Sequence, residues 1–211
     1  MKKLSIALVY GGDSSEAEVS VKSGKHVLSH IDRDLFDVHE VHLSGSEWRV
    51  VAESDVICDI DKADFSFMMD GQKVKFDTAL IMIHGTPGEN GLLQAYFEMI
   101  GMRYTTCPST VSAITFDKYA CKCFLRDTGI ALAKEILLHR RETPDEERII
   151  SKLGLPLFVK PNVGGSSFGV TKVKSSEELK GALEAAFAEA DSLRAEEYIK
   201  GREMTNGVFE S

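Results

Sequence analysis

The sequence lacks the features that mark several large classes of protein. No apolar stretch in its 211 residues approaches the roughly 18 residues of a membrane-spanning helix, so no transmembrane segment is expected. Acidic residues outnumber basic ones, 33 to 25, and the formal net charge of −8 argues against a nucleic-acid partner. The first apolar run, residues 4–10, stops at Gly11 without the cleavage site of a signal peptide. The start of the chain therefore predicts a cytoplasmic protein with no membrane partner.

Cysteine is scarce, and its spacing excludes the common metal and redox motifs. The four cysteines contain no Cys-x-x-Cys pair and no zinc-binding pattern, which favours reduced thiols. They are Cys58, Cys107, Cys121 and Cys123. The rest of the composition is that of an ordinary globular protein, with 43% hydrophobic and 27% charged residues. The length allows one large domain or two small ones.

The first half of the chain has the pattern of an α/β domain. We expect strands at residues 4–10, 36–43 and 78–83, a helix at about 16–31, and a hairpin at 64–76. Ser15 and Glu18 have the spacing of a capping box that would start the helix. The β-α-β order at the start favours a doubly wound parallel sheet.

The second half alternates helices with short strands. We expect helices at 91–99, 116–128, 144–153 and 175–190, and strands at 132–139, 157–160, 170–173, 193–199 and from Glu203 to Phe209. Thr143 and Glu146 form a second possible capping box, with Pro144 at the first helical position. A domain boundary is expected near residues 110–117. The final strand has no partner in the sequence, which suggests part of a longer protein.

The most informative segment is the glycine-rich loop from Lys160 to Gly169. Three glycines and two serines between Gly164 and Gly169 would let the backbone wrap around an anion, and Lys160 adds a positive charge. The order differs from the Walker loop, in which the lysine follows the last glycine and a helix follows the lysine. A lid over phosphates is the favoured interpretation, and a flexible hairpin turn is the alternative.

Two further segments follow expected strands, at the edge where open α/β sheets bind ligands. The first, Gly11 to Ser20, lacks the Gly-x-Gly-x-x-Gly order, so dinucleotide binding is not supported. Because Glu18 would serve the capping box, Glu16 could hold a cationic ligand group; the alternative is that Glu16 only caps the helix. The second segment, residues 84–91, makes His84 a candidate substrate-facing group, with a structural role as the alternative.

A fourth segment, from Glu196 to Glu203, is a strand that becomes a linker. Its carboxylates and exposed backbone groups suit the adenine and ribose of a nucleotide. An ordinary charged edge strand is the alternative.

Together, and in this order, the four segments resemble those of the D-alanine–D-alanine ligases of the ATP-grasp superfamily. The similarity covers the whole chain through four motifs: Gly-Gly-x-Ser-x-Glu, His-Gly-x-x-Gly-Glu-x-Gly, Lys-Pro…Gly-Ser-Ser-x-Gly and Glu-x-x-Ile-x-Gly-x-Glu. Asn90 stands where the family usually has Asp. Little effect is expected there, because the neighbouring glycines set the shape of the loop.

The resemblance implies an architecture and a reaction. It implies an N-terminal doubly wound, substrate-binding domain at residues 1–114, the first α+β half of an ATP-grasp domain at 115–198, and the start of a truncated subdomain at 199–211. The implied reaction joins two D-alanines through an acylphosphate made from ATP, in peptidoglycan precursor synthesis. Such phosphoryl transfer depends mainly on positioning and charge neutralisation. A homodimer is the implied assembly.

The resemblance also implies residue roles. Glu16 and His84 would bind the first D-alanine, and Ser166 would orient it, so that Glu16 and Ser166 are the catalytic candidates. The residues implied to contact ATP are Lys118, Lys160, Gly165, Ser166, Ser167, Glu196, Glu197, Ile199 and Glu203.

The same resemblance puts the ligands of two Mg²⁺ ions and the acceptor site beyond residue 211. No metal ligand is therefore expected in the chain, and these residues alone are expected to be inactive. Because acceptor choice would lie outside the chain, a D-alanine–D-lactate-type ligase is an open alternative. A non-catalytic nucleotide-binding module is another.

Overall fold

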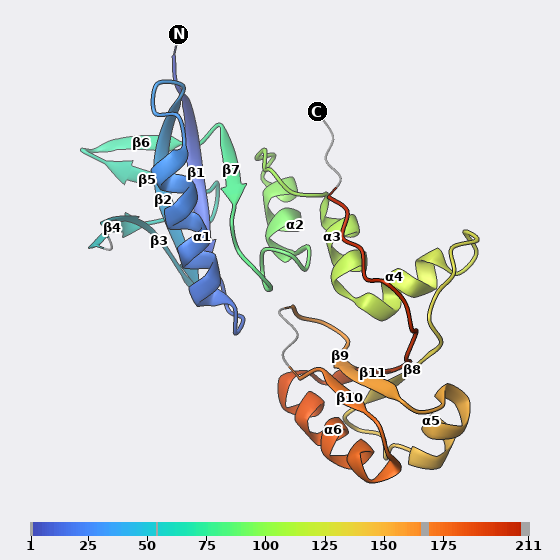
Figure 1. Ribbon diagram of the computed structural model, residues 1–211. Helices are drawn as coiled ribbons and strands as arrows, with labels where there is room; N and C mark the ends of the chain where they lie inside the picture. The colour runs from blue at the N-terminus through green and yellow to red at the C-terminus, as the bar shows by residue number, and fades with distance from the viewer. Residues whose placement is uncertain (1, 54, 166–168, 208–211) are drawn as a thin grey trace. The chain divides into compact units, whose positions relative to one another are not determined.

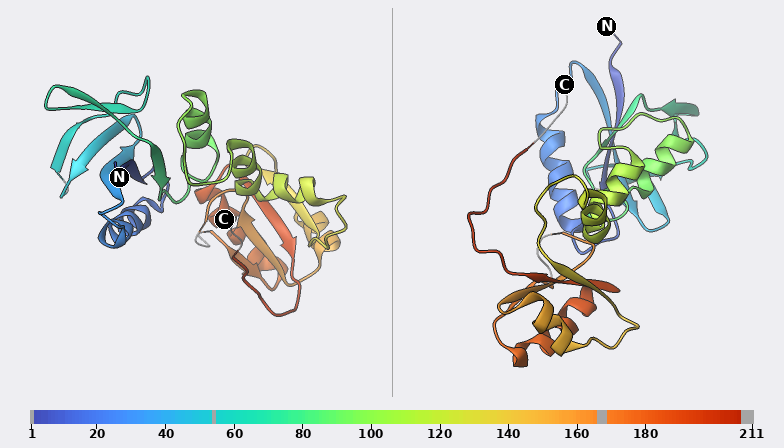
Figure 2. Two further views of the ribbon diagram at one scale, coloured as in Figure 1. Left: turned by 90° about the horizontal axis from the view of Figure 1, so that it is seen from above. Right: turned by 90° about the vertical axis from the view of Figure 1, so that its right-hand side faces the viewer.

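The computed structural model describes residues 2–53, 55–165 and 169–207. The chain forms two compact units, which are described separately (Figures 1 and 2). Unit 1 comprises residues 1–124 with 163–166, and unit 2 comprises residues 125–162 with 167–211. Within the described ranges, no helix is both long enough and apolar enough to cross a membrane. The expected domain boundaries stay a prediction.

Unit 1 is built on a five-stranded sheet in the order β4-β3-β2-β1-β7 (Figure 1). Its strands are β1 (Leu4–Gly11), β2 (Phe36–Ser44), β3 (Glu47–Ala52), β4 (Asp55–Asp59) and β7 (Thr78–Ile81). Strand β1 pairs in parallel with β2 and β7, which confirms the predicted parallel sheet. Strands β3 and β4 extend it in antiparallel fashion and are not predicted by the sequence pattern. The reason is clearest for β4, which has no buried residue and hence no apolar alternation.

Strand β1 is a continuous apolar run because both faces of the sheet are covered. Ala7 and Val9 belong to a core that includes Phe65 and Phe97. On the other face, Tyr10 packs against helix α1 (Ala17–His30), which carries the crossover from β1 to β2. Gly24 of α1 allows this close approach, because a Cβ there would lie 2.5 Å from the Tyr10 ring. The predicted hairpin is confirmed as β5 (Ser66–Met69) and β6 (Gln72–Lys75).

Three short helices follow: α2 (Leu92–Met99), α3 (Ser109–Phe116) and α4 (Lys118–Leu125). The predicted helix at 91–99 is confirmed as α2. The prediction of one helix over 116–128 is wrong, because the chain leaves the helical region at Asp117, with φ −81° and ψ 100°. The Asp117 carboxylate then accepts a hydrogen bond from Ala120 N (2.8 Å), which caps α4.

The two predicted capping boxes are wrong, although their helices exist. Glu16, not Ser15, is the N-cap of α1, and Ser14 Oγ accepts a hydrogen bond from Glu16 N (3.1 Å). At helix α5 (Glu146–Leu153) the N-cap is Asp145, whose carboxylate accepts from Arg148 N (2.9 Å). At α5 the aspartate directly before the helix accepts the free N–H group, whereas the N-cap residue of α1 makes no side-chain capping hydrogen bond among the residues that the structure describes.

Unit 2 is a four-stranded antiparallel sheet in the order β10-β9-β11-β8, with helices α5 and α6 (Ser176–Glu189) packed on one face (Figure 1). Its strands are β8 (Glu135–His139), β9 (Leu157–Pro161), β10 (Thr171–Val173) and β11 (Ser192–Glu197). These confirm the four strands predicted between residues 132 and 199, with shifted ends. Leu157 and Val159 are fully buried in the core beneath the helices. The alternating residues of each strand therefore form a separate, opposite face.

The prediction of a strand beginning at Glu203 is wrong for the described part of that segment. Residues 203–207 are exposed and lie in no strand. Residues 208 and 209 lie outside the described residues.

Candidate active site

In unit 1, the turn after β1 is shaped by two glycines. Gly11 and Gly12 have positive φ angles of 100° and 98°. A Cβ on Gly11 would lie 2.3 Å from the Leu43 carbonyl oxygen, and one on Gly12 would lie 2.9 Å from that of Thr86. Only glycine fits such angles and spacings, so the turn can pack between β2 and the loop of residues 84–91.

Glu16 lies at the start of α1 and is only 6% exposed. Its side chain makes no capping hydrogen bond within the described residues, so capping of α1 does not explain this carboxylate. A Cβ on Gly165, which also belongs to unit 1, would lie 2.8 Å from Glu16 Oε2. The glycine therefore allows the beginning of the glycine-rich loop to reach the carboxylate. A role of Glu16 in binding D-alanine stays a prediction.

His84 is held by three serines of the turn and of α1. Ser14 Oγ donates to the His84 carbonyl (2.8 Å), and Ser20 Oγ accepts from the His84 N–H (2.8 Å). Ser23 Oγ and His84 Nε2 are in hydrogen-bond contact at 3.1 Å. Ser20 and Ser23 are three residues apart on one face of α1, a spacing that could have marked them as partners of a neighbouring loop. Sequence reasoning missed both.

The loop of residues 84–91 is fixed from α2 by Gln94, which is fully buried. Gln94 Nε2 donates to the Gly88 carbonyl (2.5 Å) and to Thr106 Oγ1 (2.9 Å). Asn90, the departure from the family motif, donates to Thr86 Oγ1 (2.8 Å). These hydrogen bonds hold the 84–91 loop in one conformation at the edge of the unit 1 sheet.

Lys118 begins α4, and its ammonium donates to the Gly164 carbonyl at 2.5 Å. Both residues belong to unit 1. Gly164 has a φ of +97° with open space around its Cβ position, so glycine is needed there for conformation rather than for room. Ser166 and Ser167 lie outside the described residues, and their roles stay predictions.

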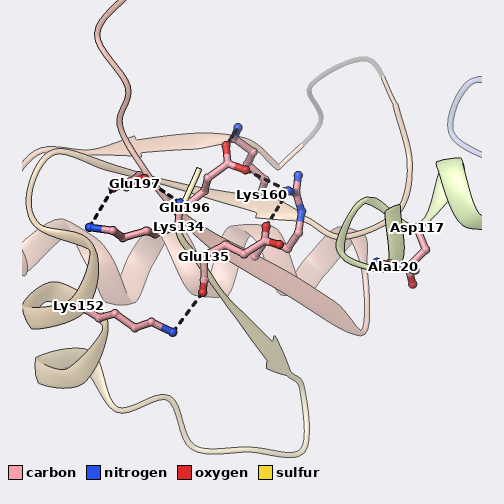
Figure 3. A network of polar contacts seen from close by, with 9 residues as sticks. Asp117, Ala120, Lys134, Glu135, Lys152, Lys160, Glu196 and Glu197 are labelled. Carbon is pink, nitrogen blue, oxygen red and sulfur yellow. Dashed lines mark hydrogen bonds and ion pairs between the residues drawn. The ribbon is translucent and has the colours of Figure 1, made fainter. Parts of the chain in front are cut away.

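In unit 2, Lys160 lies on the sheet face opposite the helices. Its ammonium pairs with Glu196 Oε1 at 2.6 Å (Figure 3). The second oxygen of Glu196 accepts from Arg194 Nη1 at 3.1 Å, and the same nitrogen donates to Glu135 Oε2 at 3.0 Å. Lys160 and Glu196 are predicted nucleotide contacts that the structure brings together. Sequence reasoning missed Arg194 and Glu135.

Aromatic rings and a second lysine border this polar group on the same face. The Lys160 ammonium lies 4.9 Å from the Phe158 ring centroid. The Lys172 ammonium lies 3.6 Å from the Tyr198 centroid, within the range of a cation–π contact. The Phe158 and Tyr198 rings are 6.0 Å apart. Cations beside flat apolar rings are chemically suited to the phosphates and base of a nucleotide.

The other residues predicted to contact the nucleotide lie at the end of β11 and beyond it. Glu197 Oε1 accepts from Lys134 N (2.7 Å), so its carboxylate ties β11 to the chain just before β8 (Figure 3). Ile199 is 64% exposed. Glu203 is also exposed. The structure thus brings Lys160 and Glu196 together, whereas Ile199 and Glu203 lie on an open segment.

No group of three or more His, Cys, Asp or Glu side chains suited to a metal ion occurs among the described residues. None of the four cysteines, all of which lie among the described residues, forms a disulfide. Burial raises the pKa of the Cys58 thiol, and Asp59 adds to the shift, so this thiol is protonated at neutral pH.

Comparison with known proteins finds one family along the chain. The model of the D-ala D-ala ligase N-terminus matches residues 5–107, and that of the D-ala D-ala ligase C-terminus matches residues 124–211. A D-alanine–D-alanine ligase of Phocaeicola vulgatus is 46% identical over 209 residues, which are 99% of this chain and 64% of that protein.

Solved structures of the same family are similar in fold to this chain. The D-alanyl-alanine synthetase A of Vibrio cholerae superposes with a TM-score of 0.83 at 28% identity, over 95% of this chain and 60% of that one. The D-alanine–D-alanine ligase of Bacillus anthracis complexed with ATP superposes with a TM-score of 0.73 at 30% identity, over 94% and 60% of the two chains.

The α/β unit, the antiparallel unit and these superpositions define the chain as an ATP-grasp protein, as the motifs indicated. Within that class, the chain belongs to the D-alanine–D-alanine ligase family. It spans about 64% of the length of the curated relatives that it matches.

Proposed function

We propose that these residues form the first-substrate and nucleotide-binding parts of a ligase that joins two D-alanines at the expense of ATP, for peptidoglycan precursors. The observation that carries the proposal is the 46% identity to a D-alanine–D-alanine ligase over 99% of the chain. An ATP-consuming reaction on free amino acids fits a cytoplasmic enzyme. A homodimer belongs to the same proposal.

Unit 1 would bind the first D-alanine. Glu16 is a nearly buried carboxylate, and a carboxylate in such a place favours a cation, such as the ammonium of an amino acid. The serine-held His84 would orient the ligand from the neighbouring loop. Phosphorylation would activate the carboxylate of this D-alanine, and the amine of the second D-alanine would attack it, releasing phosphate.

Unit 2 would bind ATP. Lys160 is about one quarter exposed, so its charge is available to phosphates yet held in place by Glu196. Phe158 and Tyr198 offer apolar rings beside it. The residues present therefore fit a nucleotide. In the proposal, Lys118 and the glycine-rich loop complete the phosphate contacts, with Glu197, Ile199 and Glu203 near the base and ribose.

Mg²⁺ would neutralise the phosphate charge during transfer. We place its ligands outside these 211 residues, as we place the acceptor site. Residues 1–211 alone are then expected to make no dipeptide.

The test is D-alanine-dependent release of phosphate from ATP, with detection of the dipeptide. We expect turnover by the full-length protein that contains this sequence, and none by residues 1–211. D-lactate as a second acceptor tests acceptor choice. ATP binding by the full-length protein without turnover on any acceptor would instead favour a non-catalytic nucleotide-binding module. Turnover by residues 1–211 at a rate near that of the full-length protein would show that the division of roles is wrong.

A further inference from the structure

Two serine hydroxyls join the backbone of Glu16 to that of His84. Ser14 Oγ accepts a hydrogen bond from Glu16 N (3.1 Å) and donates one to the His84 carbonyl (2.8 Å). Ser20 Oγ donates to the Glu16 carbonyl (3.3 Å) and accepts from the His84 N–H (2.8 Å). Each hydroxyl uses both its proton and a lone pair. The backbones of the two residues proposed to bind D-alanine are therefore held together.

A third serine, Ser23 of α1, contacts the ring of His84 instead of its backbone. Ser23 Oγ lies 3.1 Å from His84 Nε2, and the contact is partly buried. Among the described residues, neither side chain makes any other hydrogen bond. The second ring nitrogen, Nδ1, is not one of the buried atoms that lack a partner in this part of the chain. Nδ1 is therefore the polar atom of His84 that a ligand can reach.

The hydrogen-bond pattern indicates which of these two atoms supplies the proton. A serine inside a helix commonly donates its hydroxyl to the carbonyl four residues earlier, as Ser20 does to Glu16. Ser23 makes no such bond within the described ranges, so His84 Nε2 is the acceptor for its proton. If Nε2 carried the proton instead, the partly buried Ser23 hydroxyl would have no acceptor, which is costly. A neutral imidazole that accepts at Nε2 carries its own proton on Nδ1.

We infer that Ser23 is a positioning residue that keeps the proton of His84 on Nδ1, so that Nδ1–H donates to the carboxylate of the first D-alanine. This inference rests on the proposed function, because it takes the ligand to be an amino acid whose ammonium lies at Glu16. The carboxylate of that amino acid only accepts hydrogen bonds, so a lone pair on Nδ1 would repel it. A Cβ on Gly85, the residue after His84, would lie 3.8 Å from Glu16 Oε2, so both groups can reach one small ligand.

The direct test is the tautomer of His84 in the full-length protein that contains this sequence, in the absence of ligands. Nitrogen chemical shifts of ¹⁵N-labelled histidine distinguish a protonated ring nitrogen from an unprotonated one, and the His84 signals are assigned by their loss in His84→Ala. At about pH 8.5, where histidine side chains are neutral, we expect the proton on Nδ1. In Ser23→Ala we expect it on Nε2, the position that an unconstrained histidine favours. A wild-type proton on Nε2, or a folded Ser23→Ala protein that keeps the proton on Nδ1, would overturn the inference.

Steady-state kinetics test the consequence for binding. Ser23→Ala should raise the KM for the first D-alanine by about fivefold, the effect of one hydrogen bond. The KM for ATP and kcat should stay within about twofold, because Ser23 contacts no group proposed to hold ATP. Ser29→Ala is the matched control, because Ser29 Oγ makes an exposed contact with His30 Nδ1 (2.9 Å) on the same helix, and it should behave as wild type. An unchanged KM for D-alanine in Ser23→Ala, or an equal rise in both KM values, would overturn the inference.

A double-mutant cycle with His84→Ala separates positioning from packing. If Ser23 acts through the His84 ring, adding Ser23→Ala to His84→Ala should change the KM for D-alanine by less than about twofold. A change of about fivefold in that background would overturn the inference, since it marks a role of Ser23 that does not pass through the ring.

Thermal unfolding of each variant checks that it is folded. If Ser23→Ala does not fold, the wild-type tautomer decides: a proton on Nδ1 supports the inference, and a proton on Nε2 overturns it. Failure of the proposed function is seen separately. A full-length protein whose His84 carries its proton on Nδ1 in wild type and on Nε2 in Ser23→Ala, but which makes no dipeptide, contradicts the function and leaves the effect of Ser23 on the ring standing.

Discussion

The two candidate sites are constructed in different ways. In unit 1, the site depends on hydrogen bonds between side chains and a loop backbone, such as Ser14 to His84, 70 residues apart in sequence. In unit 2, the site is one face of an antiparallel sheet, and its charged residues are neighbours across strands. The first site is fixed by loop geometry, and the second by strand alternation and charge balance.

This difference predicts how each site responds to substitution. A change in the hydrogen-bonded site of unit 1 should affect both stability and binding, because the same contacts hold the fold and place the ligand groups. A change on the face of the unit 2 sheet opposite the helices should affect mainly nucleotide affinity, because the core lies on the other face of the sheet. Three substitutions can test this contrast, and a fourth tests a carboxylate of unit 1 that lies in neither site.

The largest effect is expected from Lys160→Ala in the full-length protein. Removing this cation should weaken ATP binding or turnover by at least about tenfold, roughly 1.4 kcal/mol. The midpoint of thermal unfolding should change little. Lys174→Ala, at an exposed position just after β10, is the matched control and should behave as wild type. Unchanged kinetics in Lys160→Ala would remove this lysine from the nucleotide site.

Glu16→Gln should affect the binding of D-alanine more than the binding of ATP. The change keeps the size of the side chain and removes its charge, so the KM for the first D-alanine should rise by about tenfold and that for ATP by less. Glu18→Gln, an exposed change in the first turn of the same helix, is the control. An equal rise in both constants would contradict a specific contact with the amino acid and favour a structural role.

Ser20→Ala tests whether the same contact in the unit 1 site contributes both to stability and to D-alanine binding. The change removes the acceptor for the His84 N–H, and the loss should be about 1 kcal/mol in the free energy of unfolding. Urea titration measures it, with exposed Ser15→Ala as control. The KM for D-alanine should rise along with the loss of stability. A stable variant with normal kinetics would mean that the serine contacts do not position His84.

The smallest effect concerns Glu98 of α2. Hydrogen bonds from the Ser109 side chain, the Ser109 N–H and Tyr104 hold the pKa of this carboxyl below its ordinary value of 4.5. A carboxyl with a lowered pKa in the folded state stabilises the protein above that ordinary pKa, and the stabilisation is lost as the pH falls through the folded-state pKa.

Glu98→Gln should therefore lower the melting temperature by a few degrees at most at pH 7. The difference from wild type should shrink as the pH falls below 4.5. Exposed Glu18→Gln is again the control. A difference that stays constant down to acid pH would mean that the carboxylate charge has no part in holding the start of α3.

The sequence predicts the parts of this molecule that depend on local pattern. The apolar run of β1, the alternation of β9 and the hairpin turn at Asp70-Gly71 are visible in the residues themselves. Strand β4 is not, because an exposed edge strand has no apolar period. The helix starts at Asp117 and Asp145 depend on which nearby side chain accepts a backbone hydrogen bond, and spacing alone does not decide that.

The candidate site residues also divide into those that a sequence motif indicates and those that only the tertiary structure reveals. Glu16, Lys160 and Glu196 stand in motifs, so the resemblance to a family could indicate them. Arg194 and Glu135 stand in no motif, and they meet only because the β11–β8 register places them on one face. Gln94 is similar, since its contact with Gly88 depends on how α2 packs under the loop. Strand register and the packing of distant segments belong to the tertiary structure, and the local pattern of a single sequence does not predict them.

The claim that residues 11–20 and 84–91 take the amino acid, and residues 157–161 and 194–199 the nucleotide, is tested most directly by amide hydrogen exchange on the full-length protein. Exchange is measured with a non-hydrolysable ATP analogue alone and with D-alanine alone. We expect the analogue to slow exchange in residues 157–161 and 194–199, and D-alanine to slow it in residues 11–20 and 84–91. Protection of 11–20 and 84–91 by the analogue, with 157–161 and 194–199 unchanged, would contradict the claim.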